Sequence, residues 1–402
     1  MMNTFKASPN WSAQSWVPSL DPLRGFAALA VVVHHAAQAW GVANDGASIA
    51  ATTFAWLGAW GVTLFFVLSG FCIHLPQARA FSLNGSHTID WGRFARRRAR
   101  RLLPTHYAAL ILSAAAGSLV QTDIIKAPTV AGFLAHAFMV HVWYPPLFYS
   151  INGVFWSIAI EVHFYICYPV YLWLRGRLGT VGTTVFLALT GLLTYGTASM
   201  LLQGGPRWVL QHLFLVSWWQ WALGAGLADM YVRGKAARWT GFLSVRFAPA
   251  AYLILSIAVG LKDPTIHGLH VRFWVLPVLC GALLGSLVIR RCPHVPFLSN
   301  AGIYSYSVYL IHPVAFAALF AVCGYRELPP IIGIPTTIVM ATFVSWLFFM
   351  LVERHFLSVR QRTAEPLVVF TAQTDLLSRI SYEQLKKAAQ GFLGIRREDS
   401  VG

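Results

Sequence analysis

Charged residues are scarce in this sequence of 402 residues, and acidic ones are the scarcer kind. Asp, Glu, Lys and Arg together make up 11% of the chain, against about 25% in ordinary soluble domains, while 57% of it is hydrophobic. This leaves too little polar surface for a water-soluble globule, so we expect an integral membrane protein. The first residues, with Lys6 the only charge before Asp21, do not have the pattern of a removable signal peptide.

Other absences narrow the chemistry. The histidines form no HxxxH or HExxH arrangement, and no Gly-rich loop precedes a lysine in the manner of a nucleotide phosphate cradle. The cysteines have no paired spacing, which indicates neither a disulfide framework nor a zinc site; they are Cys72, Cys167, Cys280, Cys292 and Cys323. We therefore expect no metal and no permanently bound cofactor.

Apolar runs of about 20 residues, the length that crosses a bilayer, recur along the chain. They predict an all-α bundle of about ten transmembrane helices, near 23–42, 53–75, 103–121, 150–174, 180–202, 208–231, 244–262, 270–289, 302–323 and 332–355. With a cytoplasmic N-terminus, all Lys and Arg fall inside except Lys126, Arg207, Lys262, Arg272 and Arg326. The positive-inside rule then puts both termini in the cytoplasm. This bias accounts for most of the net charge of +16 without a nucleic acid partner.

The pattern divides the chain into three regions. Residues 1–20 are expected to be a cytoplasmic segment, 21–357 the transmembrane domain, and 358–402 a cytoplasmic tail. Between Asp375 and Gln390, apolar positions alternate with basic ones, as in an amphipathic helix lying on a membrane surface. No soluble second domain and no internal repeat is evident.

Arg24 and His35 stand in an otherwise apolar segment, where ionisable side chains are functional candidates. Eleven helical steps of roughly 100° come close to three full turns, so the two share one helix face about 16 Å apart. This spacing suits a site that holds an anion at the membrane surface and carries out proton chemistry inside. A snorkelling arginine and a packing histidine are the alternative.

Arginines are concentrated just before Pro104, at Arg93, Arg96, Arg97, Arg98, Arg100 and Arg101. Guanidinium groups bind phosphate bidentately, which favours a phosphorylated cytosolic ligand. On a helix, Arg93, Arg97 and Arg101, or Arg98 and Arg101, would share a face. An anchor to anionic lipid headgroups is the alternative.

Glu161 falls inside the start of a predicted span, where an unpaired carboxylate is expensive. We expect it to pair with a histidine or an arginine, and it could orient the imidazole of His35. A structural ion pair far from the chemistry is the alternative.

His312 lies near the middle of a tyrosine-rich span, one turn after Tyr309, and a packing histidine with a tyrosine partner is the simpler interpretation. Ser69 has Gly61 and Gly70 on the same span, which favours close helix packing over a nucleophile.

Five stretches in order resemble the acyltransferase-3 membrane proteins, a family that includes acylases of O-antigens, exopolysaccharides and macrolides. The five stretches are Asp21–His35, Gly61–Phe71, Arg98–Pro104, Trp156–Tyr165, which includes Glu161, and Tyr304–Pro313. Near the end, Glu353-Arg354-His355 stands where the family usually has Glu-Arg-Pro.

The resemblance implies roles for individual residues. It implies catalytic roles for His35, Arg24 and Glu161, and donor binding on the cytosolic side for Arg98 and Arg101, to which we add Arg93. The remaining candidates, which we expect to contact the substrate, are Ser69, Trp156, Tyr309 and His312.

The chemistry of the residues fits the same reaction. Acyl transfer from a thioester to an alcohol needs a base, and histidine is the side chain that titrates near neutral pH. We therefore expect an O-acyltransferase, most simply an O-acetyltransferase that modifies polysaccharides in a bacterial inner membrane. The donor is acyl-CoA as a co-substrate, and the acceptor is a glycan, glycolipid or glycosylated small molecule. A proton-coupled transporter of an anionic or lipid-linked sugar is the alternative function.

Overall fold

The computed structural model describes residues 20–42, 49–85, 89–233, 250–252, 254–255, 258, 265–266, 269–290, 295–323 and 329–357. All of these belong to one unit, Met1–Leu357. The predicted amphipathic helix at 375–390 and most of the predicted span at 244–262 lie outside the described residues.

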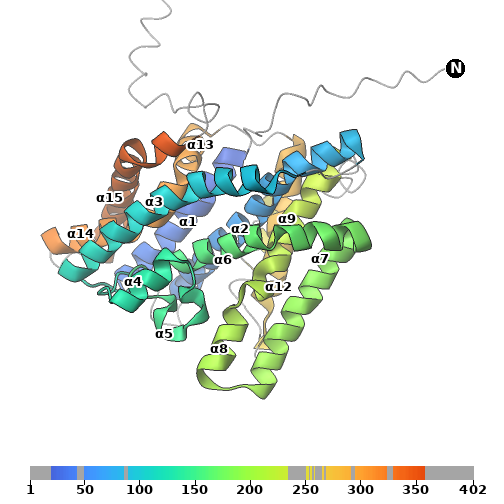
Figure 1. The fold of residues 1–402 in the computed structure, drawn as a ribbon. Helices are drawn as coiled ribbons and strands as arrows, with labels where there is room; N and C mark the ends of the chain where they lie inside the picture. Colours follow the sequence, from blue (N-terminus) through green and yellow to red (C-terminus); the bar gives the residue numbers. More distant parts are fainter. Residues whose placement is uncertain are drawn as a thin grey trace, which may run out of the picture. The chain divides into compact units, whose positions relative to one another are not determined.

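The described chain is helical apart from one short pair of strands (Figure 1). The first helices are α1 (Asp21–Ala39), α2 (Ile49–Asn84), α3 (Trp91–Leu119), α4 (Val130–Ala137), η2 (His141–Trp143), α5 (Pro145–Phe148) and α6 (Phe155–Ile166). They are followed by α7 (Tyr168–Leu201), α8 (Gly204–His212), α9 (Phe214–Val232), α12 (Val271–Arg290), α13 (Pro296–Ile303), α14 (Ser305–Cys323), α15 (Pro330–Leu351) and η3 (Glu353–Phe356). Strands β1 (Thr265–Ile266) and β2 (Leu269–His270) pair antiparallel.

Several predicted spans are interrupted in the structure. The helix expected at 150–174 ends at Ile166, and α7 begins directly after Cys167. Within α7 the backbone leaves the helical conformation at Gly179, whose φ of 69° is readily adopted only by glycine. The span expected at 208–231 is divided at Leu213, and α13 ends just before Tyr304. Hydropathy marked these segments as apolar but could not locate breaks inside them.

Five helices in the described ranges are long and apolar enough to cross a membrane, as judged by length and composition. They are Ala50–Leu83, Trp91–Leu119, Tyr168–Leu201, Ser305–Val322 and Pro330–Leu351. Their exposed positions include many large hydrophobic side chains, which suits a lipid environment. These are the features of an integral membrane protein.

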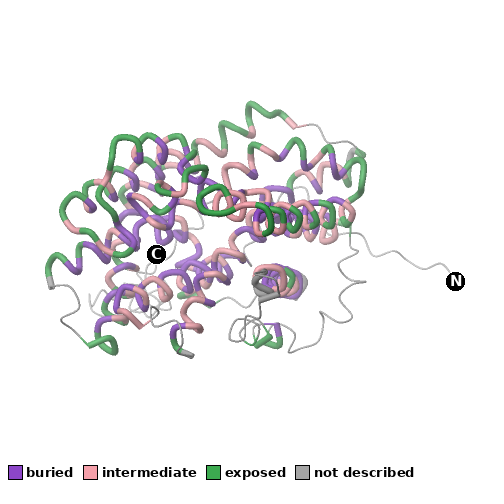
Figure 2. Tube along the Cα trace, turned by 90° about the horizontal axis from the view of Figure 1, so that it is seen from below, coloured by how far each residue is buried: buried purple, intermediate pink, exposed green. Residues whose placement is uncertain are grey.

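The helices pack around α1 and α2. Helix α2 packs against α1 and α9, α1 also packs against α13 and α14, and α14 packs against α15. Buried positions lie along the inner sides of these helices, and exposed ones are mainly at the outer edges (Figure 2). Among the candidate membrane-crossing helices, α14 and α2 are the most enclosed.

Glycines set the closest approach between α2 and α9. A Cβ added at Gly70 would meet the backbone carbonyl of Trp221, and one at Gly224 would meet the carbonyl of Val67. Small residues at such crossings let the backbones of membrane helices approach closely. Gly25 serves the same purpose where α1 meets α13.

We expect Gly224→Ala to lower stability by about 1–3 kcal/mol, the usual cost of overpacking, because the new Cβ meets backbone that cannot rotate away. Thermal unfolding in detergent measures the change. The matched control is Gly196→Ala on α7, where nothing lies within 4 Å of an added Cβ. Equal behaviour of the two variants would contradict the close crossing.

Candidate active site

Arg24 is held near the start of α1 by two partners. Its guanidinium lies 2.7 Å from the Asp21 carboxylate and donates to Cys72 Sγ on α2 at 2.9 Å. Arg24 is half-buried, so this pairing offsets part of the cost of placing its charge in the bundle. His35 lies eleven residues further along the same helix, and the structure does not bring it into contact with Arg24.

His35 instead meets His312 from α14. His35 Nδ1 lies 2.9 Å from His312 Nε2, and the rings stack with centroids 5.1 Å apart. His312 Nδ1 lies 2.9 Å from the Val308 carbonyl oxygen, which can only accept, so this nitrogen carries the proton. His312 Nε2 then accepts a hydrogen bond from His35 Nδ1. A neutral His35 is thus left with its lone pair on Nε2.

Glu161 has a tyrosine partner, which differs from the expected pairing with histidine or arginine. The Tyr165 hydroxyl, one turn later on α6, donates a short hydrogen bond to the Glu161 carboxylate. Ser69 on α2 lies 3.2 Å from the same hydroxyl. Among the described residues, no lysine, arginine or histidine forms an ion pair with Glu161. Ser69 therefore has a polar partner as well as a close-packed helix around it.

Tyr309 of α14 contacts both α6 and His312. Its hydroxyl lies 2.6 Å from Ser157 Oγ on α6, and its ring centroid is 6.3 Å from that of His312. The hydroxyls of Tyr309 and Tyr306 both interact electrostatically with Glu161. One broad face of α14 therefore runs past Glu161 to His312.

The arginine cluster is divided between two faces of α3. Arg98 and Arg101 are half-buried, whereas Arg93 is exposed and forms an ion pair with Asp90 at 3.4 Å. Asp90 also accepts from the Arg93 backbone N–H, which caps the helix at its start. Arg96, Arg97 and Arg100 are exposed too. The structure therefore separates Arg93 from the two arginines that face inward.

Arg98 and Arg101 have different surroundings. Arg98 lies over the Phe94 ring at 5.8 Å, and its Nε is buried without a hydrogen-bond acceptor among the described residues. Arg101 lies 2.6 Å from the fully buried carboxylate of Glu353. Glu353 also accepts from Ser307 through both its backbone N–H and its hydroxyl, in the first turn of α14. Of the inward pair, Arg98 is the one without a carboxylate partner among the described residues.

A second ionic network lies between α2, α7 and α9. Asp229 accepts two hydrogen bonds from Arg175, at 2.6 and 2.7 Å, and lies 3.2 Å from His74. His74 Nδ1 lies 2.8 Å from the Tyr168 hydroxyl, and the Tyr168 ring packs on Phe94. The positive-inside rule counted Arg175 only as one of the cytoplasmic positive charges, but the structure buries its side chain. The network supports the ring beneath Arg98.

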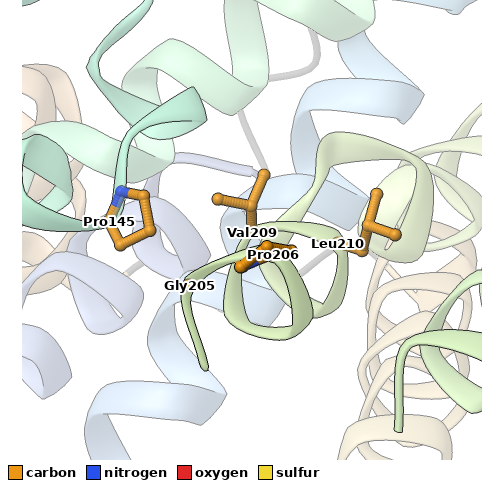
Figure 3. Close-up of a pocket in the computed structure, with 5 residues that line it drawn as sticks. All are labelled: Pro145, Gly205, Pro206, Val209 and Leu210. Carbon is orange, nitrogen blue, oxygen red and sulfur yellow. The ribbon is translucent and has the colours of Figure 1, made fainter. Parts of the chain in front are cut away.

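Trp156 belongs to an aromatic cluster. Its ring stacks on Phe148 with centroids 5.7 Å apart, and Phe148 contacts Trp208 and His212 of α8. Beside this cluster lies an open apolar pocket of about 410 Å³, where Pro145 faces one turn of α8 (Figure 3). Its other lining residues are Gly205, Pro206, Val209 and Leu210.

Three fully buried histidines form a separate cluster. The His136 and His141 rings stack with centroids 3.7 Å apart, and His106 Nε2 lies 3.3 Å from the His136 carbonyl oxygen. Burial lowers the pKa of His136 to about 4 and that of His141 to about 2. In the part of the chain that the structure describes, no group of three or more His, Cys, Asp or Glu side chains could hold a metal ion.

Comparison with known proteins agrees with the motifs along the chain. The model of a family described as an acyltransferase domain, acyltransferase 3, matches residues 17–350. The chain belongs to the acyltransferase-3 family.

Two relatives illustrate the range of this family. Acyltransferase MdmB of Streptomyces mycarofaciens is 32% identical over 162 residues, which is 40% of this chain and 39% of that protein. Peptidoglycan O-acetyltransferase OatA of Listeria monocytogenes is 27% identical over 169 residues, 40% of this chain and 25% of that protein. The matched segments thus span less than half the length of either relative. No solved structure matches the chain.

The motifs of the family contain residues whose importance only the geometry reveals. Tyr165, Ser157 and Glu353 were given no role from the sequence, although Tyr165 stands four residues after Glu161, a spacing that brings side chains together on a helix. Glu353 carried the same signal as Glu161, a carboxylate in an apolar stretch. For Tyr165 and Glu353, a usable signal was present in the sequence.

The histidine cluster predicts loss of stability in acid. In the unfolded chain a histidine titrates near 6.5, so below that pH the unfolded state binds protons that buried His136 and His141 do not. Stability should fall as the pH drops from about 6.5 toward about 4, and each histidine should lower the folding constant about tenfold per pH unit. Thermal unfolding across this range measures the slope. His141→Phe keeps a ring against His136 and should flatten the slope; an unchanged slope would show that other groups are responsible.

Proposed function

We propose that this protein is a membrane O-acyltransferase that transfers an acyl group, most simply acetyl, from cytosolic acyl-CoA to a hydroxyl of a carbohydrate or glycosylated acceptor. The observation that carries the proposal is the hydrogen bond between His35 Nδ1 and His312 Nε2. It leaves His35 Nε2 as an unprotonated nitrogen in a half-buried position inside a membrane protein, which suits a general base. Membership of the acyltransferase-3 family supports the same chemistry.

In the proposed reaction, His35 Nε2 takes the proton of the acceptor hydroxyl as its oxygen attacks the thioester carbonyl carbon. The C–S bond breaks, and the proton passes from His35 to the sulfur of the departing CoA. His312 keeps the imidazole in the required tautomer and stabilises the positive charge that His35 gains, because its Nε2 accepts from His35 Nδ1. No proton is gained or lost overall.

The donor side is proposed to lie at Arg98. Its guanidinium faces the bundle with an unused Nε, which suits a phosphate group of CoA. Arg101 and Arg24 are already paired with Glu353 and Asp21, so we assign them to shaping the passage rather than to the main phosphate contact. We do not assign the exposed Arg93 to the donor.

The acceptor and the location are proposed from the relatives and from the charge pattern. OatA carries the name of a peptidoglycan O-acetyltransferase, which supports a glycan acceptor. The bias of basic residues supports cytoplasmic termini and a bacterial inner membrane. Glu161, Trp156 and the aromatic residues near Phe148 are then candidates for contact with substrate. No observation favours the transporter alternative.

We expect His35→Ala to insert and fold but to lose at least about 100-fold in transfer, the scale of a lost general base. His312→Ala should lose much of the same activity, because the His35 tautomer is no longer held. The measurement is transfer from acetyl-CoA to a glycan acceptor by purified protein in proteoliposomes. Val33→Ala, a truncation at a half-buried apolar position of the same helix, is the control. Wild-type turnover in His35→Ala would rule out the assignment.

Arg98→Gln should raise the donor KM about tenfold or more and leave the acceptor KM nearly unchanged, because a charge-assisted phosphate contact is worth about 1.5–3 kcal/mol. Arg98→Lys should rescue only part of the loss, since a point charge lacks the guanidinium fork. Exposed Arg97→Gln is the control. Equal losses toward donor and acceptor would indicate a structural role instead.

A further inference from the structure

A group of hydroxyls from α2, α6 and α14 gathers along one face of α6, in two hydrogen-bonded sets. We call it the hydroxyl seam; it consists of Ser69, Tyr165, Ser157 and Tyr309, with the Glu161 carboxylate among them. At one end, the Tyr165 hydroxyl interacts electrostatically with Arg98. At the other end, Tyr309 packs beside His312.

The hydrogen bonds of the seam use up its donors. Tyr165 donates to Glu161, so the bond between Tyr165 and Ser69 is donated by Ser69. Ser157 donates to the Val154 carbonyl at 3.2 Å, so Tyr309 donates to Ser157. The unused capacity is therefore all of one kind, namely lone pairs on Ser69 Oγ, the Tyr309 oxygen and the Glu161 carboxylate.

A ligand in the seam must consequently bring hydrogen-bond donors and no negative charge. An anion would be repelled by Glu161, which has no cationic partner among the described residues. Burying an N–H group in an apolar bundle without a hydrogen-bond acceptor costs free energy. The free acceptors of the seam would therefore favour an extended ligand that carries N–H groups at intervals. The pantetheine arm of CoA is neutral and has two secondary amides. Its phosphates would remain at Arg98, whose positive charge favours them.

We infer that the hydroxyl seam binds the amide N–H groups of the pantetheine arm and guides the thioester from Arg98 to His35. This inference rests on the proposed acyl-CoA donor. It gives Ser69 and Tyr309 a specific task, which is to accept hydrogen bonds from the donor, and it makes them binding residues for the donor rather than for the sugar.

The test compares CoA with an analogue whose two pantetheine amide nitrogens are replaced by ester oxygens. The analogue keeps the carbonyls and phosphates but lacks the N–H groups. Equilibrium binding of each compound to the full-length protein in detergent is measured for the wild type, Ser69→Ala, Tyr309→Phe and the double variant. Both substitutions leave their former partners satisfied, because Tyr165 still donates to Glu161 and Ser157 to Val154. Ser118→Ala on the exposed side of α3 and Tyr304→Phe are the controls.

We expect the wild type to prefer CoA over the ester analogue by about tenfold or more, and the double variant to bind the two nearly equally, since each hydrogen bond is worth about 0.5–1.5 kcal/mol. The controls should keep the wild-type preference. Equal weakening toward both compounds would overturn the inference in favour of a structural role. Unchanged CoA binding with a raised acceptor KM would overturn it in favour of a sugar site.

The binding measurement separates this inference from the proposed function. Selective CoA binding without any acyl transfer would contradict the proposed reaction and leave the seam as a pantetheine site. Transfer from acetyl-CoA with no preference for amide over ester would support the reaction and overturn the seam. Failure to bind CoA at all would overturn the seam directly.

Discussion

A single buried carboxylate, Glu353, sets the relative position of the two sides of the candidate site. It pairs with Arg101 of α3 and accepts two hydrogen bonds from Ser307 at the start of α14. Breaking such a buried pair costs about 3–5 kcal/mol, because the remaining charge has no solvent to stabilise it. Helix α3 carries Arg98, and α14 carries Tyr309 and His312. The path between the proposed donor arginine and the histidine pair therefore depends on this contact.

Ionisable groups in an apolar bundle need partners. Groups that already have a partner support the site, whereas groups without one are available to bind or react. Arg24 is held by Asp21, and Asp229 is held by Arg175 and His74. Arg98 Nε and His35 Nε2, by contrast, have no partner among the described residues. These unused groups lie at the two ends of the hydroxyl seam, which is why the proposed chemistry is assigned there.

Helix α6, which ends before Cys167, carries three polar residues of the candidate site. Because α6 ends at Ile166, it is a short helix of 12 residues that packs among longer ones. Ser157, Glu161 and Tyr165 recur every four residues along it and so lie on one face. That face meets Ser69 on α2 and Tyr309 on α14.

The sequence by itself determined the helical membrane class and the candidates His35 and Glu161, because hydropathy and the cost of an ionisable residue in an apolar run are local properties. Its motifs gave the family and Arg98, because motifs are local too. Even the contact between Glu161 and Tyr165 follows from helical spacing. Only the tertiary structure decided which distant groups meet. His35 and His312 are 277 positions apart and Arg101 and Glu353 are 252 apart, and neither pair has a sequence signal that names its partner. Partner choice follows from which helix faces pack together, and that is settled by close contacts such as those of Gly70 and Gly224 rather than by the composition of any one helix.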